Sequence, residues 1–228
     1  MQRYFLAVAG NIGVGKTHLT HWLGARLGWE VFLEPVLENP YLDDFYADMR
    51  RWSFPLQIFL LSKRFEMHRK MMDNMLSCIQ DRTIYEDAEI FARTLYDTGA
   101  MEARDFENYM ALFQCMTSYL QVPNAIIYLR ADVETLLRRI ASRGRQCESG
   151  IQRAYLERLN AAYDDWAARS APELRFVVVD TPGMEPIEEH PAIVKLVAEI
   201  EAGVPPQDLG AAAGPRGGGR RRRSGGNR

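Results

Sequence analysis

The stretch VAGNIGVGKTHLT, residues 8–20, holds the first residues whose types and spacing could do chemistry. It contains the pattern G-x-x-x-x-G-K-T, directly after an apolar run. Glycines in such a loop let backbone N–H groups point at phosphate oxygens, and the following helix adds its positive N-terminal end. The pattern predicts a site for ATP, with the lysine on the β- and γ-phosphates and the threonine on Mg²⁺. The residues expected there are Gly10, Asn11, Ile12, Gly13, Val14, Gly15, Lys16 and Thr17.

Charged residues also stand where two expected strands end. Glu34 ends the strand expected at 30–34, and Asp81 and Arg82 come at the end of the strand expected at 78–81. Ligands of parallel α/β folds lie at the carboxyl ends of the strands. Glu34 could therefore accept a proton from an attacking hydroxyl, Asp81 could hold a metal ion, and Arg82 could stabilise phosphate oxygens. Read alone, Glu34 also fits an acid that faces water, and Asp81 with Arg82 fits a surface pair.

Three arginines gather in the segment LRRIASRGRQCESG, residues 137–150. Arg139 and Arg143 lie four residues apart and so share one helical face, and Arg145 follows across Gly144. Arginines at a helix end beside a glycine are typical of a mobile lid that closes over phosphates. A solvated basic helix end is the alternative.

A further set of residues could bind a flat, hydrogen-bonding ligand. Gln57 interrupts the apolar run FPLQIFLL, and Arg64 lies two turns further on the same helical face. Asp87 and Phe91, four residues apart on another expected helix, also share a face. Three polar groups and one aromatic ring are what a nucleobase needs for its edge and its face. An internal salt bridge with ordinary core packing is the alternative.

These residues depend on alternating strands and helices, which predict an α/β fold with a parallel sheet flanked by helices. The strands are expected at residues 3–9, 30–34, 78–81, 125–129 and 175–179. The helices are expected at 15–27, 41–49, 53–77, 86–97, 103–120, 132–142, 151–168 and 188–202. We expect one domain over residues 1–203 and a disordered Gly/Arg-rich basic tail over 204–228.

Composition restricts the class of protein. The 228 residues are 47% hydrophobic and 25% charged, without an apolar run long enough for a membrane helix and without a signal-peptide pattern. The three widely spaced cysteines fit free thiols in the cytoplasm. The net charge of −2 includes six arginines in residues 211–228, where no acid occurs. Contact with nucleic acid through this tail is a minor possibility, beside a solubilising extension.

Taken together, these residues resemble the deoxynucleoside kinases of the deoxycytidine/deoxyguanosine kinase group, particularly bacterial deoxyadenosine/deoxyguanosine kinases. The resemblance runs from about residue 3 to residue 200 and rests on the segments GNIGVGKT, EPV, FYADMRRWSFPLQ, DRTIYEDAEIF, RGR and ESGI…YLERL, in the family's order. It implies a P-loop kinase fold, with a five-stranded parallel sheet and an arginine-rich lid, that usually forms a homodimer.

The resemblance also implies a role for individual residues. Glu34 matches the base that acts on the nucleoside 5′-hydroxyl, and Arg82 the group that stabilises this oxygen. Tyr46 and Glu148 match the residues that hold the sugar 3′-hydroxyl. The base-edge and stacking groups match Gln57, Arg64, Asp87 and Phe91, and the lid matches Arg139, Arg143 and Arg145. The family often has a glutamate at the position of Asp81.

The expected activity is therefore ATP-dependent 5′-phosphorylation of a deoxyribonucleoside in nucleotide salvage. Relatives that accept thymidine tend to have an apolar residue at position 64, so Arg64 favours deoxyadenosine, deoxyguanosine or deoxycytidine. We expect a purine because the overall match to bacterial purine kinases is strongest.

Two rival functions share some of these features. A nucleoside monophosphate kinase, such as a thymidylate kinase, also has a phosphate loop, an Asp-Arg pair and a lid, but Glu34 would repel its anionic acceptor. A non-catalytic nucleotide-binding subunit usually lacks a catalytic group, whereas Lys16, Thr17, Glu34 and Arg82 are all present.

Overall fold

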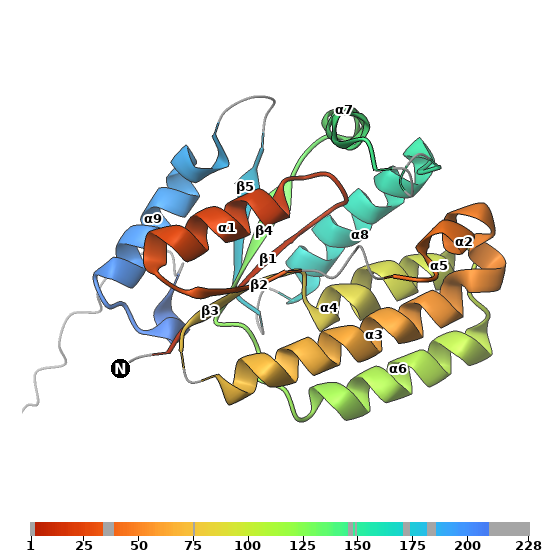
Figure 1. Cartoon of the computed structure of the whole chain (residues 1–228), viewed down its shortest axis with the longest axis horizontal. Coiled ribbons are helices and arrows are strands. Elements are labelled where there is room, and N and C mark those ends of the chain that lie inside the picture. The colour runs from red at the N-terminus through yellow and green to blue at the C-terminus, as the bar shows by residue number, and fades with distance from the viewer. Residues whose placement is uncertain are drawn as a thin grey trace, which may run out of the picture.

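The computed structural model describes residues 3–33, 39–74, 76–145, 148, 150–170, 174–181 and 186–209. Within these ranges, the strands form one sheet in the order β2-β3-β1-β4-β5, and every neighbouring pair is parallel (Figure 1). This confirms the predicted five-stranded parallel sheet. The strands are β1 (Phe5–Gly10), β2 (Glu30–Phe32), β3 (Cys78–Asp81), β4 (Ala125–Arg130) and β5 (Phe176–Asp180).

The register of the central strand brings the phosphate loop beside the charged end of β3. Val8 of β1 pairs with Asp81 of β3, and Gly10 of β1 pairs with Leu129 of β4. Since all three strands run in the same direction, their carboxyl ends meet at one edge of the sheet. The loop after β1 therefore lies next to Asp81 and Arg82.

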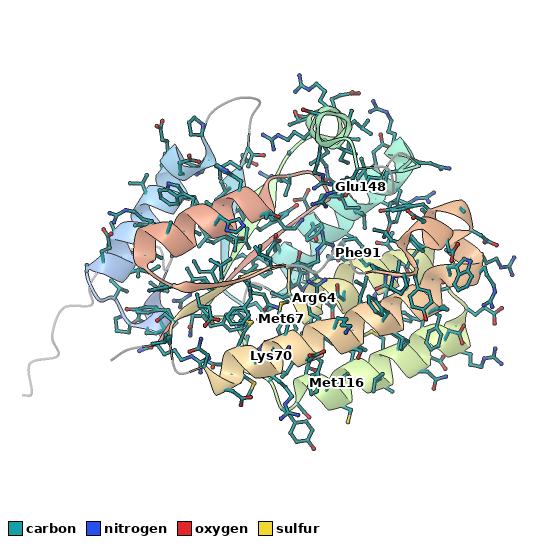
Figure 2. The ribbon with its side chains drawn as sticks, in the orientation of Figure 1. Arg64, Met67, Lys70, Phe91, Met116 and Glu148 are labelled. Carbon is teal, nitrogen blue, oxygen red and sulfur yellow. The ribbon has the colours of Figure 1, made fainter. Side chains whose placement is uncertain are left out.

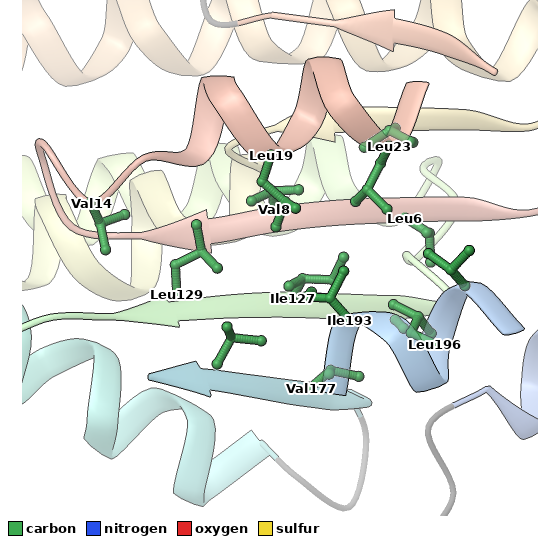
Figure 3. Packing of buried hydrophobic residues seen from close by; sticks show 14 of the residues in the cluster. Leu6, Val8, Val14, Leu19, Leu23, Ile127, Leu129, Val177, Ile193 and Leu196 are labelled. Carbon is green, nitrogen blue, oxygen red and sulfur yellow. The ribbon is translucent and has the colours of Figure 1, made fainter. Parts of the chain in front are cut away.

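One face of the sheet is covered by α1 (Lys16–Leu27) and α9 (Pro191–Glu201) (Figures 1 and 3). Successive strand residues point to opposite faces, so alternate positions of β1 and β4 share this layer. Figure 3 shows Leu6 and Val8 of β1 with Ile127 and Leu129 of β4, all fully buried. This continuous apolar layer fixes the helix that begins at the phosphate loop.

The opposite face is covered by α8 (Arg153–Ser170) and by a broken helical run, α4 (Ile84–Glu86), η1 (Asp87–Ala92) and α5 (Arg93–Asp97). Ala7 and Ala9 of β1 are small, and the aromatic rings of Tyr163 and Trp166 from α8 belong to the same buried cluster. Outside this layer, α3 (Met49–Asp73) packs along α6 (Ala103–Thr117) (Figure 1). The remaining elements are α2 (Leu42–Ala47), α7 (Val133–Arg143), η3 (Ile187–Glu189) and η4 (Pro206–Asp208).

Several helices end earlier than predicted: α2 at Ala47 instead of 49, α3 at Asp73 instead of 77, and α6 at Thr117 instead of 120. Two helices begin earlier than predicted. The helix expected at 53–77 already begins at Met49, because the Asp48 side chain accepts the N–H of Arg51 at 3.1 Å and caps it. It consequently contains Pro55 in its interior. The helix expected at 86–97 begins at Ile84 and is a π-helix from Asp87 to Ala92. Such wider turns are rare and often occur at functional sites.

None of the helices in the described ranges is long and apolar enough to cross a membrane. Cys78 and Cys115 are free thiols, as expected, and Cys147 lies outside the described residues. The first residues of the expected tail are ordered, since η4 lies at Pro206–Asp208 and Leu209 is fully buried in the core, whereas residues 210–228 lie outside the described residues.

A buried histidine links α3 to the segment before β4. The side chain of His68 is 1% exposed, its Nε2–H donates to the carbonyl of Gln121 at 2.9 Å, and its ring packs edge-on against Phe5. Burial, with a smaller effect from the charge of Arg3, lowers the pKa of His68 from its ordinary 6.5 to about 4, although the hydrogen bond to Gln121 opposes this shift. The ring is therefore neutral in the folded protein and is protonated more readily after unfolding.

We expect this histidine to make the protein less stable as the pH falls from about 6.5 to about 4, because the unfolded chain binds the proton first. Between pH 7 and pH 5 the free energy of unfolding should fall by about 2 kcal/mol through His68 alone. Urea denaturation of the wild type and of His68→Gln, which keeps a donor for Gln121, measures this contribution. Equal pH dependence in the two proteins would contradict it.

Candidate active site

A cavity of about 680 Å³ opens at the carboxyl ends of β1 and β3. Its wall includes most of the residues singled out from the sequence: Ile12, Gly13, Gly15, Lys16, Thr17, Tyr46, Gln57, Asp81, Arg82, Phe91, Arg139, Arg143, Arg145 and Glu148. Others from the same set do not line the cavity: Gly10, Asn11, Val14, Arg64 and Asp87. Glu34 lies outside the described residues.

The phosphate loop has the backbone shape that its glycines predict. Gly10, Gly13 and Gly15 have φ angles of 142°, 82° and 110°, which side chains other than glycine rarely adopt. A Cβ on Gly10 would lie 2.5 Å from the carbonyl oxygen of Leu129, so this position also requires the absence of a side chain. Lys16 is 7% exposed, and its Nζ donates to the carbonyls of Gly10 and Asn11 at 2.9 and 3.1 Å.

Asn11 holds the loop from behind. Its Nδ2 donates to the carbonyl of Leu156 at 2.9 Å and to Oδ1 of Asn160 at 2.7 Å, both on α8, while its Oδ1 accepts the N–H of Ile12. The side chain of Asn11 is thus engaged with α8, and only its backbone is left to face a phosphate.

Thr17 and Asp81 meet at the edge of the sheet. The hydroxyl of Thr17 donates to Oδ2 of Asp81 at 2.6 Å. The other oxygen of Asp81, Oδ1, is buried and has no hydrogen-bond partner among the described residues. A buried carboxylate oxygen without a partner is costly, and Mg²⁺ prefers oxygen ligands of this kind. The pair fits a magnesium ion.

Arg82 is held in an uncommon backbone conformation. Its φ of 65° is the one positive value at a residue other than glycine among the described residues. The N–H of Arg82 donates to the carbonyl of Val8 at 3.0 Å, and its guanidinium carbon lies 4.3 Å from the ring centroid of Phe91. The left-handed turn directs this buried cation into the cavity, over the ring that was expected to stack on a base.

The three arginines expected in a lid all line the cavity. Arg139 donates to the carbonyl of Val14 in the phosphate loop at 2.8 Å, and burial lowers its pKa. Arg143 donates through Nε to Glu148 at 3.1 Å and also through Nη2, and Arg145 reaches the other carboxylate oxygen at 3.5 Å. Cationic groups that are partly buried beside a phosphate loop gain from an anionic ligand.

The residues expected at the sugar come from two segments that meet. Tyr46 of α2 lines the cavity, as does Glu148. A Cβ on Gly150, two residues after Glu148, would lie 3.7 Å from the Cβ of Tyr46. The segment that carries Glu148 therefore packs against α2.

Among the residues expected to bind the nucleobase, Gln57 and Arg64 of α3 are each 1% exposed, as their shared helical face predicts. Arg64 lies on the side of α3 that faces the sheet (Figure 2), and it binds Asp87 through two hydrogen bonds of 2.8 and 3.0 Å. Oε1 of Gln57 is buried and has no partner among the described residues. The amide at the cavity wall thus has hydrogen-bonding capacity that a ligand can use.

A family model described as deoxynucleoside kinase matches residues 6–202. The chain belongs to the deoxynucleoside kinase family. Members transfer a phosphoryl group to the 5′-hydroxyl of a deoxyribonucleoside, and this chain is such an enzyme. The two rival functions, a nucleoside monophosphate kinase and a non-catalytic subunit, are not favoured.

Similar proteins agree with this assignment. The kinase is 41% identical to a deoxyadenosine/deoxycytidine kinase of Bacillus subtilis over 77% of this chain and 82% of the relative. It is 34% identical to a deoxyguanosine kinase of the same organism, over 77% of this chain and 86% of the relative. A deoxyadenosine kinase from M. mycoides, solved with bound dATP, superimposes with a TM-score of 0.75 at 30% identity, covering 86% of this chain and 99% of that chain.

Several residues of this kinase site were missed in the sequence. Tyr155 of α8 lines the cavity, and burial raises the pKa of its hydroxyl. Asn160 supports Asn11, and Glu86 hydrogen-bonds the first glycine of the loop. The spacing of Tyr155 looks like ordinary core packing of α8. Only Glu86 had a local signal, the helix-capping pattern T-x-x-E, which does not indicate its other contacts.

The close contact at Gly10 yields a prediction about the loop. Gly10→Ala should lower the free energy of unfolding by at least about 2 kcal/mol and weaken ATP binding, because the new methyl group meets the Leu129 carbonyl in a conformation reserved for glycine. Gly99→Ala is the matched control: Gly99 also has a positive φ of 72°, with nothing within 4 Å of its added Cβ. That variant should lose about 1 kcal/mol. Urea denaturation and titration calorimetry with ATP measure both effects, and similar losses in the two variants would contradict the argument.

Proposed function

We propose that this kinase phosphorylates deoxyadenosine or deoxyguanosine, with deoxycytidine as the next candidate, in nucleotide salvage. The observation that carries the proposal is the cavity itself. It joins a phosphate loop with Lys16 and Arg82 at one end to a buried amide, Gln57, beside the Arg64–Asp87 pair at the other. The names of the related enzymes from B. subtilis favour deoxyadenosine, deoxycytidine and deoxyguanosine over thymidine.

In this proposal, Glu34 is the base that takes the proton from the 5′-hydroxyl of the nucleoside. The order of the chain supports this role: Glu34 comes two residues after Phe32, the last residue of β2, and β2 is the neighbour of β3, which ends at Asp81. Arg82 stabilises the attacking oxygen and the phosphates, and Lys16 leaves its two carbonyl partners for the β- and γ-phosphates. Phosphoryl transfer depends mainly on such positioning and charge stabilisation.

Arg139, Arg143 and Arg145 complete the donor site as a lid over the phosphates of ATP. Thr17 and Asp81 would hold Mg²⁺, supported by the buried Oδ1 of Asp81. When bound, the ion offsets the negative charge of the phosphate oxygens.

On the acceptor side, Tyr46 and Glu148 hold the 3′-hydroxyl of the sugar. Gln57, Arg64 and Asp87 bind the edge of the base, and Phe91 stacks on its face; in this structure Arg64 and Asp87 bind each other and do not line the cavity. An amide offers both a donor and an acceptor, which matches the paired amino group and ring nitrogen of adenine or cytosine. We also propose, on the family resemblance, a cytoplasmic homodimer.

The first test is an assay of the purified chain with Mg²⁺ and ATP, with the four deoxynucleosides and, separately, their monophosphates as acceptors. We expect monophosphate and ADP from deoxyadenosine or deoxyguanosine, and less product from thymidine than from any other deoxynucleoside. Product mainly from thymidine would contradict the role of Arg64 and Asp87. Turnover of the monophosphates alone would contradict the assignment of the acceptor.

The role of Glu34 has its own test. Glu34→Gln should lower kcat by about 10²- to 10⁴-fold, because the amide cannot accept the proton. Glu38→Gln, four residues further along the chain, is the control for a general effect of lost charge. Steady-state kinetics at saturating nucleoside and ATP measure both variants. Full turnover by Glu34→Gln would show that Glu34 is not the base.

A further inference from the structure

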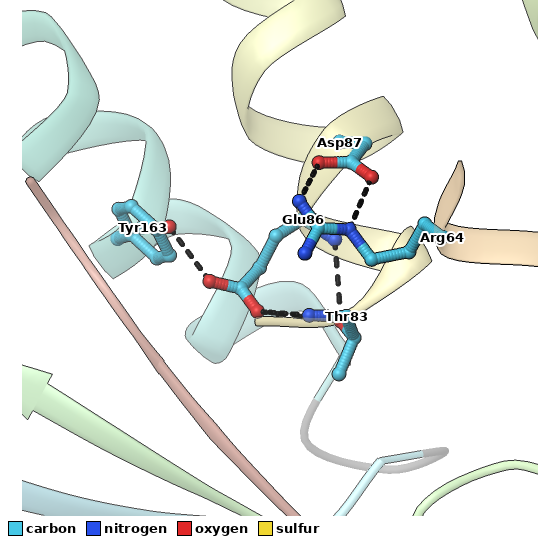
Figure 4. A network of polar contacts seen from close by, with 5 residues as sticks. All are labelled: Arg64, Thr83, Glu86, Asp87 and Tyr163. Carbon is cyan, nitrogen blue, oxygen red and sulfur yellow. Dashed lines mark hydrogen bonds and ion pairs between the residues drawn. The ribbon is translucent and has the colours of Figure 1, made fainter. Parts of the chain in front are cut away.

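Glu86 is a buried carboxylate for which the proposed reaction has no use. Its side chain is completely inaccessible to solvent, and Figure 4 shows it between Thr83 and Tyr163. One oxygen, Oε1, accepts the hydroxyl of Tyr163 at 2.7 Å and the N–H of Gly10 at 3.3 Å. The other, Oε2, accepts the N–H of Thr83 at 2.8 Å and its hydroxyl at 3.3 Å. All four partners are donors, which an ionised carboxylate satisfies best.

These contacts exceed what helix capping requires. A capping box needs only the reciprocal bonds between Thr83 and Glu86, and such glutamates normally stand in water. Here Oε1, which the capping box does not need, binds two other elements: β1 through the N–H of Gly10 and α8 through the hydroxyl of Tyr163. Burial raises the pKa of Glu86, while the charges of Arg82 and Lys16 and the donated hydrogen bonds oppose this rise. Burying a carboxylate costs free energy, and this cost points to a role beyond helix capping.

Two of these partners, Thr83 and Gly10, adjoin groups that the proposed function places at the phosphates. Thr83 directly follows Arg82, whose positive φ persists only where the surroundings enforce it. On one side of this turn, the N–H of Arg82 is held by Val8; on the other, the N–H of Thr83 is held by Glu86. The same carboxylate binds Gly10, whose carbonyl accepts Nζ of Lys16.

We propose that Glu86 is a positioning residue for Arg82: it anchors the left-handed turn that carries Arg82 to the first glycine of the phosphate loop and to α8. The proposal rests on the role given above to Arg82 in the phosphoryl transfer. Glu86 does not touch the phosphates or the nucleoside. It fixes the place of the cation relative to the loop that binds the phosphates.

The test is Glu86→Gln in the full-length protein. The amide has the same size, but its NH₂ group faces donors, and a backbone N–H cannot accept a hydrogen bond. We expect kcat to fall about 10- to 100-fold, because a misplaced cation loses stabilisation of the transition state. The KM for the nucleoside should change less than about threefold, because the base and sugar contacts are intact.

A double-mutant cycle with Arg82→Gln separates positioning from a general structural effect. If Glu86 acts through Arg82, adding Glu86→Gln to Arg82→Gln should lower kcat by less than about twofold. A full additional loss in the double variant, or a kcat of Glu86→Gln within twofold of the wild type, would overturn the proposal. If Arg82→Gln itself keeps full activity, the proposed role of Arg82 in the phosphoryl transfer is wrong. This outcome differs from those that contradict the positioning role of Glu86.

A milder pair of variants keeps the proposal testable if Glu86→Gln does not fold. Tyr163→Phe removes the hydroxyl that donates to Glu86. Tyr128→Phe is the matched control: the ring of Tyr128 stacks on that of Tyr163 with 5.5 Å between the ring centroids, but its hydroxyl donates to Asp164 instead. We expect kcat to fall about two- to fivefold in Tyr163→Phe and to stay unchanged in Tyr128→Phe. Equal kcat values in the two variants would contradict the proposal.

Discussion

Backbone N–H groups can bind a phosphate only if they stay aimed at it, and the site of this kinase depends on that constraint. The glycines that allow the loop to turn also make it easy to deform, so the loop needs support from outside. Asn11 ties it to α8 and Glu86 accepts the N–H of its first glycine. Arg139 binds the carbonyl of Val14 from the side of α7. The conformation is therefore fixed before a nucleotide arrives, which reduces the entropy lost on binding.

The order of the strands extends this support to the rest of the site. β1 is central, and β3 and β4 lie on either side of it. The pairing of Val8 with Asp81 sets the last residue of β3 beside the loop, so that Thr17 at the start of α1 reaches Asp81 directly. Arg82 then leaves the strand in a left-handed turn. A cation, a carboxylate and a hydroxyl thus converge because of strand register, without a loop that has to move into place.

The sequence predicts the parts of the site that are local. The eight residues from Gly10 to Thr17 contain the whole phosphate loop, and the apolar runs before and after them predict β1 and α1. The same holds for the shared face of Gln57 and Arg64, since one helix determines it. The start of α3 was predicted four residues late, because the cap at Asp48 was overlooked.

Contacts between distant segments could not be predicted in this way. Glu86 and Tyr163 are 77 residues apart, and Asn11 and Asn160 are 149 apart. Nothing in their own neighbourhoods distinguishes them from a capping residue or from polar residues of a helix surface. Their meaning depends on which helices cover the sheet, and this follows from packing of the whole chain. For that reason the residues of the phosphate loop were easier to recognise than the residues that hold the loop in place.

Under the proposed function, recognition explains the buried pair of Arg64 and Asp87 better than stability does. Removing two charges from water costs several kcal/mol per ion, and apolar residues of similar volume often stabilise a core as well or better. The bidentate geometry instead fixes both side chains in one orientation beside the cavity. Gln57 adds a buried oxygen without a partner among the described residues, which itself costs about 1–3 kcal/mol. A ligand with hydrogen-bonding groups along a flat edge would recover part of that cost, whereas an apolar ligand would recover none. In the proposed function, the polar end of the cavity favours a nucleobase, because a ligand without such an edge would leave the buried amide oxygen of Gln57 without a partner.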